Sequence, residues 1–510
     1  MELPKLKRIT ENQKKRPKIL LLSDDILSTS GIGTMSKTFV LGTADRFNWV
    51  QLAAALNHPD HGKVADISEM VNKETGLTDS SVKLYLNTGY GNEEILRHIL
   101  EVEKPDAILH FTDPRFWDWL YAMEYSIHQE YKIPIMYYAI WDNFPYPYWN
   151  ASSYSSCDLI MAISKQSHLI HKKVLEYAQV RTLEIDQVKA GDKVFPGDVL
   201  VKYVPHGIDG TKYFPIKEGS DIYEEYKKFK DDFETKNNSN FVIFWTNRNV
   251  RRKQPGDVML AYRIFLDSLP KEDAMKCVLF MHTSPIDENG TDLFAVKRAI
   301  LGEGKDSYKV IFSVNKLDVK AMNFFYNLAD VTLNIASNEG FGLSSAESLM
   351  AGTMVINNVT GGLQDQMRFE EDGGEWYTPD EQLPTNHGGL LEKCGEWAIP
   401  VFPSNRSLQG SLATPYILDD RACPEDVAEA MMTVYNMSKE ERTRRGALGA
   451  WWMLSDESMM SSGWMSANIA TSIETCLSTW KPKPKIELIK VNAPKKIVDA
   501  GITITNKATI

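Results

Sequence analysis

The sequence predicts an α/β protein built of two facing, doubly wound, Rossmann-like domains. Short apolar runs of strand length alternate with helix-length segments along most of the chain, the pattern of parallel sheets covered by helices. This alternation occurs twice, on either side of a stretch rich in Lys, Asp and Glu at 217–239. A chain of 510 residues is also too long for one hydrophobic core. We therefore expect two domains, a deep cleft between them and a charged, partly helical connection.

The composition is that of an ordinary globular protein, with 43% apolar and 25% charged residues. No apolar run reaches the length of a membrane span, and residues 1–18 are polar and basic, unlike a secretory signal. The cysteines are odd in number and lack metal-ligand spacing, which predicts reduced thiols in a cytoplasmic protein. They are Cys157, Cys277, Cys394, Cys423 and Cys476.

The net charge of −11 argues against broad nonspecific binding to nucleic acid, although it permits a local basic surface. Lysines and arginines gather at the two ends, in residues 1–17 and in the Lys- and Pro-rich residues 481–510. We interpret both ends as solvated tails. The sequence gives no indication of an oligomeric state.

Residues 18–216 form the first predicted domain, which begins with an apolar run typical of a buried parallel strand at 18–23. In doubly wound sheets ligands bind beyond the carboxyl ends of the strands, so the residues that follow each strand are candidates for a site. The further predicted strands are 107–110, 133–138, 159–163 and 201–204, and the predicted helices include 35–46, 93–102 and 117–130.

A glycine turn follows the first predicted strand, where Gly31, Ile32 and Gly33 precede the helix predicted at 35–46. A strand, a glycine turn and a helix together suit a nucleotide or a phosphate, because glycine permits close backbone approach. The third glycine and the distal acidic residue of a dinucleotide site are missing. By itself, the turn is therefore a weak indication of a phosphate site.

Two loops of the first domain have unusual compositions. Residues 141–149 are rich in aromatic side chains, which predicts a platform on which an acceptor sugar or base stacks. The alternative is a packed loop that covers the cleft. Residues 186–198, within the stretch 180–201, are rich in turn formers and predict an extended hairpin or a loop insertion.

Residues 240–445 form the second predicted domain, which begins with a strand at 241–245. Four cations follow within six positions, from Arg248 to Lys253. A strand end in the cleft is where a diphosphate needs neutralising; arginine grips phosphate oxygens bidentately and lysine supplies a point charge. The remaining strands are predicted at 278–281, 310–312, 331–335 and 354–356.

The most informative stretch follows the strand predicted at 331–335. Gly340 and Gly342 form a turn before a helix expected at 346–351. Both glycines permit positive φ and close backbone approach, and the N-terminus of a helix carries free N–H groups and partial positive charge. This stretch therefore predicts a phosphate site.

Two glutamates, Glu339 and Glu347, bracket this turn and can face one crevice. An alternative is that Ser344 and Glu347 only form a capping box, in which the glutamate satisfies a backbone N–H. Farther along, residues 446–480 predict a helical segment whose tryptophans pack across a domain interface and lead back to the first domain.

Together these motifs resemble the retaining glycosyltransferases of family four, which have the GT-B fold. The resemblance follows the order of the motifs over roughly 18–480 rather than continuous similarity. It rests on four segments: the glutamates around Gly-Phe-Gly at 339–347, the cationic pair Arg248 and Lys253, the glycine loop at 30–33, and the Pro-x-Gly-Ile/Val-Asp segment at 204–209.

The resemblance implies a role for each motif. Arg248 and Lys253 would bind the donor diphosphate and stabilise the charge on the departing nucleotide, which requires no metal or bound cofactor. Glu347 would bind the ribose and Glu339 the hydroxyls of the sugar. The implied donor site comprises Gly31, Ile32, Gly33, Arg248, Lys253, Glu339, Gly340, Phe341, Gly342, Leu343, Ser344 and Glu347.

One position departs from the family pattern. Many members carry a histidine after the strand assigned here to 133–138, where this chain has Trp141. Asp142 could contact the sugar or the acceptor instead, and it joins Glu339, Arg248 and Lys253 as a catalytic candidate; His110 could also supply an imidazole. The catalytic base is left unassigned.

We therefore expect a hexosyl- or pentosyltransferase that moves a sugar, with retention, from a nucleotide-diphosphate donor to an acceptor hydroxyl. The acceptor could be a glycan, a lipid-linked sugar, a protein or a small molecule. A narrower hypothesis is a hydroxymethylated base in phage DNA, which would place the protein in a host cytoplasm. The alternatives of another class are a nucleotide-sugar epimerase and a non-catalytic binding protein.

Overall fold

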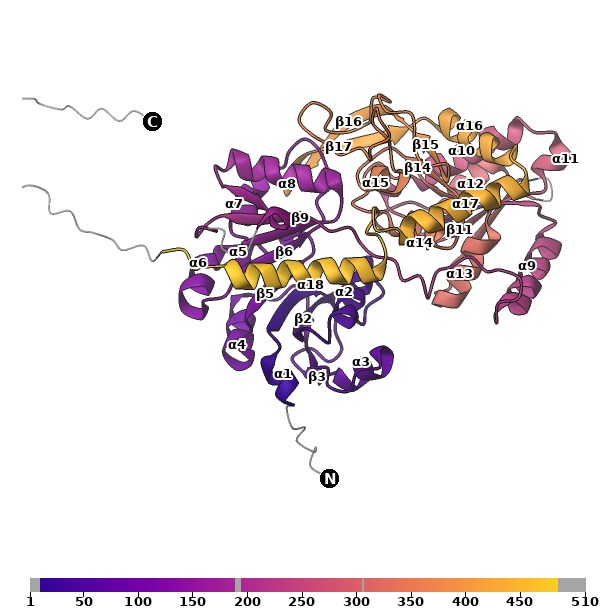
Figure 1. Ribbon diagram of the computed structural model, residues 1–510. Coiled ribbons are helices and arrows are strands. Elements are labelled where there is room, and N and C mark those ends of the chain that lie inside the picture. The colour runs from indigo at the N-terminus through magenta and orange to yellow at the C-terminus, as the bar shows by residue number, and fades with distance from the viewer. Residues whose placement is uncertain (1–9, 189–193, 305–306, 485–510) are drawn as a thin grey trace, which may run out of the picture.

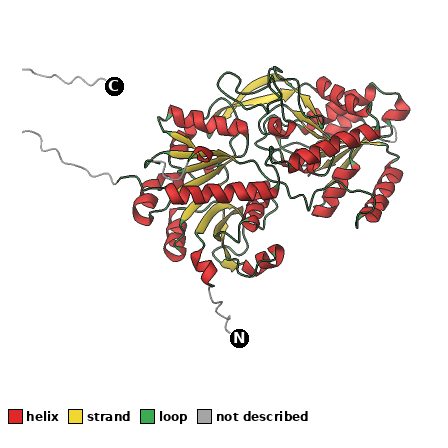
Figure 2. Ribbon diagram, in the orientation of Figure 1, coloured by secondary structure: helices red, strands yellow, loops and turns green. Residues whose placement is uncertain are grey.

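The computed structural model describes residues 10–188, 194–304 and 307–484, which form two α/β lobes joined side by side (Figure 1). Each lobe contains a twisted sheet flanked by helices (Figure 2). Most of the basic ends, residues 1–9 and 485–510, and the centre of the predicted insertion, residues 189–193, lie outside the described residues.

The first domain is organised around β1, whose residues Ile19 to Leu22 are fully buried. This burial explains their uninterrupted apolar sequence, because both faces of a central parallel strand are covered by helices. Its strands are β1 (Lys18–Asp24), β2 (Asn48–Leu56), β3 (Val64–Asp66), β4 (Val82–Thr88), β5 (Ala107–Phe111), β6 (Ile135–Ala139), β7 (Leu159–Ala162), β8 (Thr182–Glu184) and β9 (Val199–Tyr203). They lie in the order β3-β4-β2-β1-β5-β6-β7-β9-β8 and are parallel except for β3.

Four helices of this domain begin at side-chain caps, which are Thr10, Ser30, Asn92 and Ser164. Ser30 accepts a hydrogen bond from the backbone N–H of Gly33, so α2 begins at Gly31 rather than at residue 35. The predicted glycine turn is therefore the first turn of the helix itself. The helices are α1 (Glu11–Lys15), α2 (Gly31–Gly42), α3 (Ser68–Thr75), α4 (Glu93–Glu103), α5 (Asp118–Ala122), α6 (Glu124–Ser126), α7 (Ala151–Ser155) and α8 (Lys165–Tyr177).

The second domain contains a six-stranded parallel sheet in the described part of the chain, in the order β12-β11-β10-β13-β14-β15. These strands are β10 (Phe241–Thr246), β11 (Cys277–His282), β12 (Lys309–Ser313), β13 (Val331–Asn334), β14 (Val355–Asn358) and β15 (Ala398–Val401). The helices are α9 (Tyr223–Asn237), α10 (Pro255–Asp267), α11 (Lys271–Ala274), α12 (Leu293–Leu301), α13 (Val319–Leu328), α14 (Leu343–Met350), α15 (Leu363–Met367) and α16 (Pro424–Tyr435).

An antiparallel hairpin, β16 (Pro403–Ser411) and β17 (Thr414–Ala422), extends this domain and was not predicted. The Leu418 N–H donates to the Phe144 carbonyl at 2.8 Å, so the hairpin reaches the first domain. Its β16 sequence is polar and largely exposed, without the alternation that identifies a half-buried strand.

The C-terminal segment consists of two helices, α17 (Lys439–Leu454) and α18 (Ser462–Thr479), where one continuous helical segment was expected. α17 lies against the second domain, and a Cβ on Gly446 would stand 1.9 Å from the Gly352 carbonyl oxygen. α18 returns to the first domain, where Glu474 pairs with Arg46 at 2.9 Å (Figure 1). Side chains of both domains share one continuous apolar core.

Two predictions about the first domain are corrected in part. β8 pairs parallel with β9, so the described part of the 180–201 stretch is not a hairpin; between these strands it forms a short 3₁₀ helix, Ile185–Gln187, and loop, in line with the alternative of a loop insertion. Residues 11–15 of the basic N-terminal segment form α1, and Arg16 pairs with Asp79 at 2.9 Å, so this part packs against the domain. Residues 1–9 lie outside the described residues.

Candidate active site

A cavity of about 520 Å³ lies between the domains, a volume typical of small-ligand sites. Its walls bring together the carboxyl end of β1, the loops after β5, β6 and β9, the loop after β10 and the turn before α14, as expected for facing doubly wound sheets. The hairpin completes the wall. The lining residues include Ser30, Gly31, Ile32, Asp113, Arg115, Trp141, Asp142, His206, Arg251, Arg252, Glu339, Gly340, Phe341, Gly342, Leu343, Thr414 and Ile417.

The turn before α14 is held in one conformation. Gly342 has a φ of +94°, which favours glycine, and α14 begins at the next residue. The Gln366 amide donates to the carbonyl of Phe341 at 2.6 Å and to that of Gly342 at 3.1 Å. These bonds fix the turn, and the first N–H groups of α14, which have no acceptor within the helix, are available to an anion.

Glycines also stand where the two domains approach each other closely. A Cβ at Gly340 would stand 3.0 Å from Ile163 Cδ1 and 3.2 Å from the Ile140 carbonyl oxygen of the first domain. A Cβ at Gly31 would stand 3.1 Å from Leu343 Cδ1 of the second domain. The glycine segments of both domains therefore face each other across the cavity.

Glu339 lies at the centre of a buried charge cluster. Its carboxylate accepts from the Lys253 ammonium and, at 3.3 Å, from the Arg252 guanidinium. Burial opposes ionisation of Glu339, but these two cations outweigh it and lower its pKa. Burial lowers the pKa of Lys253 to about 8, because the Glu339 carboxylate offsets only part of the cost of desolvating the ammonium.

The structure does not bring Arg248 to this cluster. Its guanidinium is 65% exposed and pairs with Asp287 at 2.9 Å, outside the residues that line the cavity. Arg252 instead faces the cavity and donates to the Asn338 carbonyl at 2.9 Å. The charged run was found from the sequence, but its spacing did not show which arginine would point inward.

Glu347 is also outside the lining of the cavity, and it does not form the capping box. Gly342 is the N-cap of α14, which places Glu347 in the second turn, where it accepts from the Tyr326 hydroxyl at 2.7 Å. Burial raises the pKa of Glu347 to about 7, against the opposing effect of that hydrogen bond. Lys253, Gly33 and Ser344 are likewise absent from the lining, and Lys253 is linked to the cavity through its ion pair with Glu339.

Asp142 faces the cavity from the first domain, half-buried opposite the glycine turn. A Cβ at Gly340 would stand 3.8 Å from its Oδ2. Burial raises the pKa of Asp142 to about 7; the Arg252 guanidinium opposes this rise, and the Glu339 carboxylate adds to it. A carboxyl group with such a pKa can exchange a proton near neutral pH.

The imidazole in the cavity comes from His206 and not from His110. His110 is fully buried, its Nδ1 lies 2.7 Å from the Tyr121 hydroxyl, and it is absent from the cavity lining. His206 lines the cavity at the end of β9. The sequence places His206 in the Pro-x-Gly-Ile/Val-Asp segment, directly after a predicted strand, where ligand-binding residues of such sheets are expected; no role was assigned to it.

The aromatic loop at 141–149 packs against the hairpin, as its alternative interpretation expected. The Trp149 and Tyr416 rings meet at 4.4 Å, and the Tyr416 hydroxyl donates to the Tyr146 carbonyl at 3.1 Å. Of this loop, Trp141, Asp142 and Asn143 line the cavity. Phe144, Tyr146 and Trp149 are partly buried by packing, whereas Tyr148 is exposed but lies outside the cavity lining.

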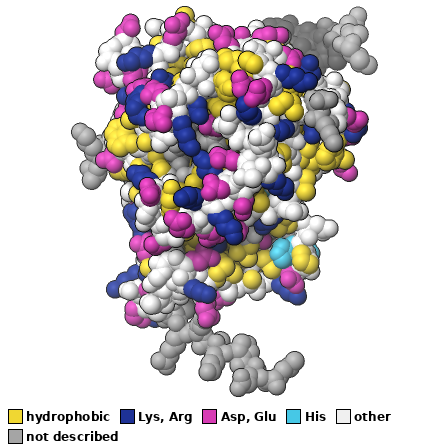
Figure 3. All heavy atoms as spheres, turned by 90° about the vertical axis from the view of Figure 1, so that its right-hand side faces the viewer, with side chains coloured by type: hydrophobic (Ala, Val, Ile, Leu, Met, Phe, Trp, Pro, Cys, Tyr) yellow, Lys and Arg dark blue, Asp and Glu magenta, His cyan; other side chains and the backbone are white. Residues whose placement is uncertain are grey.

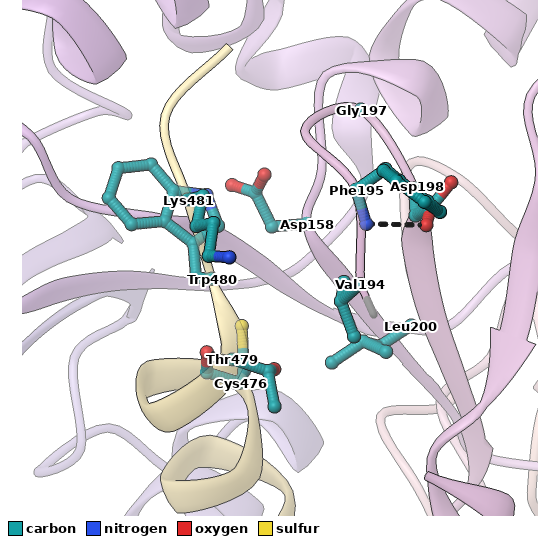
Figure 4. A pocket seen from close by; sticks show the side chains of 10 residues that line it. All are labelled: Asp158, Val194, Phe195, Gly197, Asp198, Leu200, Cys476, Thr479, Trp480 and Lys481. Atoms are coloured by element: carbon teal, nitrogen blue, oxygen red, sulfur yellow. Dashed lines mark hydrogen bonds between the residues drawn. The ribbon is translucent and has the colours of Figure 1, made fainter. Parts of the chain in front are cut away.

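A second pocket lies where the chain leaves α18 and crosses the edge of the first sheet (Figure 4). Its volume of about 10 Å³ corresponds to about one water molecule. Trp480, Asp158 and the loop at Phe195 enclose it, and the Phe195 N–H donates to Asp198 at 2.8 Å. Residues of the C-terminal segment and of the first domain pack together around this pocket, which is too small for a substrate.

No protein-family model matches the chain. A segment of 117 residues is 28% identical to the trehalose synthase of Pyrococcus horikoshii, and it covers 23% of this chain and 27% of that protein. The chain thus matches about a quarter of that relative's length. None of the helices in the described part of the chain combines the length and the hydrophobicity needed to cross a bilayer.

Solved structures match over nearly the whole chain. A structure from E. coli, named for trehalose-6-phosphate and bound with UDP-2-fluoro glucose, superposes with a TM-score of 0.58 and 12% identity over 89% of this chain and 98% of that one. The sucrose-phosphate synthase of Thermosynechococcus elongatus superposes with a TM-score of 0.56 and 13% identity, over 91% of this chain and 100% of that one. The chain has the GT-B fold. That prediction is confirmed, whereas membership of family four stays a prediction.

Proposed function

We propose that the protein is a glycosyltransferase that moves a sugar from a nucleoside-diphosphate donor to an acceptor hydroxyl. The observation that carries this proposal is the interdomain cavity, where Glu339, paired with the buried Lys253 and the exposed Arg252, meets the N-terminus of α14 and Asp142 of the opposite domain. The fold it shares with a structure bound to UDP-2-fluoro glucose supports a nucleotide-sugar donor.

The arrangement suits cleavage of a sugar–phosphate bond. The leaving diphosphate gains negative charge. Arg252 and the first turn of α14 lie in the cavity wall and can stabilise that charge, and Lys253, outside the lining, adds positive charge through its pair with Glu339. Glu339 is ionised and can accept hydrogen bonds from the hydroxyls of the sugar. Arg248 and Glu347 would complete the site only if donor binding draws the diphosphate and ribose toward them.

The stereochemistry and the acceptor are also part of the proposal. Retention rests on the resemblance to family four, with same-face attack by the acceptor hydroxyl. The surface in Figure 3 shows Lys and Arg interspersed with Asp and Glu rather than a continuous basic face, which gives duplex DNA no evident docking surface on that side. The names of the structural relatives favour a small phosphorylated sugar as the first acceptor to test.

The test is a thermal-shift panel of UDP, GDP and ADP sugars, followed by measurement of nucleoside diphosphate released with and without candidate acceptors. The acceptors are glucose 6-phosphate, fructose 6-phosphate and duplex DNA that contains hydroxymethylated bases. Stabilisation by one donor and acceptor-dependent release support the proposal. Donor conversion without acceptor and without release of the diphosphate indicates an epimerase, and no stabilisation by any nucleotide sugar refutes a donor site.

A further inference from the structure

We infer that His206 orients the transferred sugar by donating a hydrogen bond from its Nε2–H to a sugar oxygen in the interdomain cavity. This inference rests on the proposed function and adds to it a residue that the implied donor site did not contain. His206 is 5% exposed and lies in the cavity wall, so its small free surface belongs to the site.

The hydrogen bond to Tyr138 fixes which ring nitrogen carries the proton. The Tyr138 hydroxyl lies 2.8 Å from His206 Nδ1, and both side chains are buried. This contact is the one hydrogen bond of that hydroxyl among the described residues, and burial holds the Tyr138 pKa well above its ordinary value. A buried O–H left without an acceptor is costly, so the hydroxyl donates to Nδ1.

The imidazole is therefore a donor on its cavity side. Burial lowers the pKa of His206 to about 3, so the ring is neutral at physiological pH. A neutral imidazole carries one proton, and with Nδ1 accepting from Tyr138 that proton is on Nε2. Since Nε2 then has no lone pair to offer, His206 cannot serve as the base that deprotonates an acceptor.

The ring is also held in one direction. Its face and edges contact the rings of Phe111 at 5.6 Å, Tyr138 at 5.3 Å and Phe341 at 5.2 Å. Phe341 belongs to the glycine turn of the second domain, so His206 spans the junction that holds the donor. Nε2 has no hydrogen-bond partner within the parts of the chain that the structure describes.

The chemistry around this N–H selects a sugar rather than a phosphate. The diphosphate is met by the cations Lys253 and Arg252, whereas His206 offers a single neutral donor in the same cavity as the carboxylate of Glu339. A sugar hydroxyl can accept from the imidazole and donate to the carboxylate at once. The His206 N–H and the Glu339 carboxylate together would contribute to turnover by holding the sugar ring, and hence its reacting carbon, in one position.

His110 provides a matched control. It is likewise a buried histidine whose Nδ1 contacts a tyrosine hydroxyl, at 2.7 Å, and burial lowers its pKa to about 3 as well, but it lies outside the cavity. Replacing each histidine with glutamine or leucine changes packing in comparable surroundings. The two series therefore separate a contact with the sugar from a general effect on folding.

The experiment uses the full chain and measures diphosphate release from UDP-glucose, GDP-mannose and ADP-glucose with glucose 6-phosphate or fructose 6-phosphate as acceptor, with UDP, GDP and ADP binding measured by calorimetry. His206→Leu is expected to lower turnover at saturating donor about tenfold or more and to leave the affinity for the bare diphosphate within about twofold. His206→Gln, which keeps an N–H donor, restores part of the rate. His110→Leu and His110→Gln keep the rate per folded molecule.

Unchanged turnover in His206→Leu overturns the inference while leaving the proposed function intact. An equal loss in the two leucine variants per folded molecule also overturns it, because the effect would then come from packing. If the wild type binds the diphosphates but releases none from any nucleotide sugar, both the inference and the proposed glycosyl transfer fail.

Discussion

Replacement of Lys253 by methionine tests the proposed diphosphate site most directly. The Lys253 side chain is 8% exposed, and its ammonium pairs with Glu339 beside the turn before α14. Methionine keeps most of the volume of the side chain and removes its charge. The variant therefore isolates the contribution of the buried cation to binding of a nucleoside diphosphate.

The size of the effect follows from these contacts. A hydrogen bond to a charged group contributes roughly 1.5–3 kcal/mol, so the dissociation constant of the matching diphosphate should rise about tenfold to 150-fold. The free energy of unfolding should fall by about 1–3 kcal/mol. This cost stays below that of a fully unpaired buried charge, because Arg252 remains 3.3 Å from Glu339.

Calorimetric titration with UDP, GDP and ADP at low ionic strength measures the loss. Lys202→Met is the matched control, because Lys202 is also buried and paired with a carboxylate, Asp186 at 2.7 Å, but lies outside the cavity. It should reduce stability without changing affinity. A folded Lys253→Met protein that binds the diphosphate as tightly as the wild type would refute the assignment.

Three further predictions concern titration and donor recognition. Lys253 loses its charge as the pH rises through about 8, so the affinity for the diphosphate should fall above pH 8 in the wild type and stay level in Lys253→Met. The same pH dependence of affinity in both proteins would contradict this. Burial raises the pKa of Asp142 from 3.8 to about 7, so ionisation of this carboxyl lowers the stability of the fold increasingly as the pH rises from about 4 to 7. Asp142→Asn should therefore raise the melting temperature more at pH 8 than at pH 5. An equal shift at the two pH values would count against this. If Glu347 binds ribose, Glu347→Gln should weaken UDP binding about tenfold or more and leave pyrophosphate binding unchanged; an equal loss for both ligands would remove that role.

Much of the fold followed from local pattern. The apolar run at Ile19 to Leu22 predicted a covered strand, and the strands near 241–245 and 331–335 lie within about two residues of their predicted positions. Other strands were missed. β4 does alternate apolar and polar side chains, and its pattern could have been used; β2 is interrupted by polar residues and β16 lies largely exposed. The burial of β2 and the exposure of β16 depend on neighbours that are distant along the chain.

The site was predicted in part. Glu339, Gly340, Gly342 and Asp142 do line the cavity, because each follows a parallel strand whose carboxyl end faces the cleft. Arg248 and Glu347 lie outside that lining, since side-chain direction in a loop or helix depends on available partners, here Asp287 and Tyr326. Sequence spacing identified the segments but not the direction of every side chain.

The sequence by itself determined that this chain forms two doubly wound domains with glycine turns and a cationic strand end at their cleft, because backbone conformation and burial periodicity are local properties. Tertiary structure alone decided that Arg252 joins Lys253 at Glu339 and that the hairpin closes the cavity. It also decided that Tyr138 fixes the imidazole of His206. These features join residues tens to more than 200 positions apart, and their hydrogen bonds and desolvation exist only once both domains have folded around one cavity.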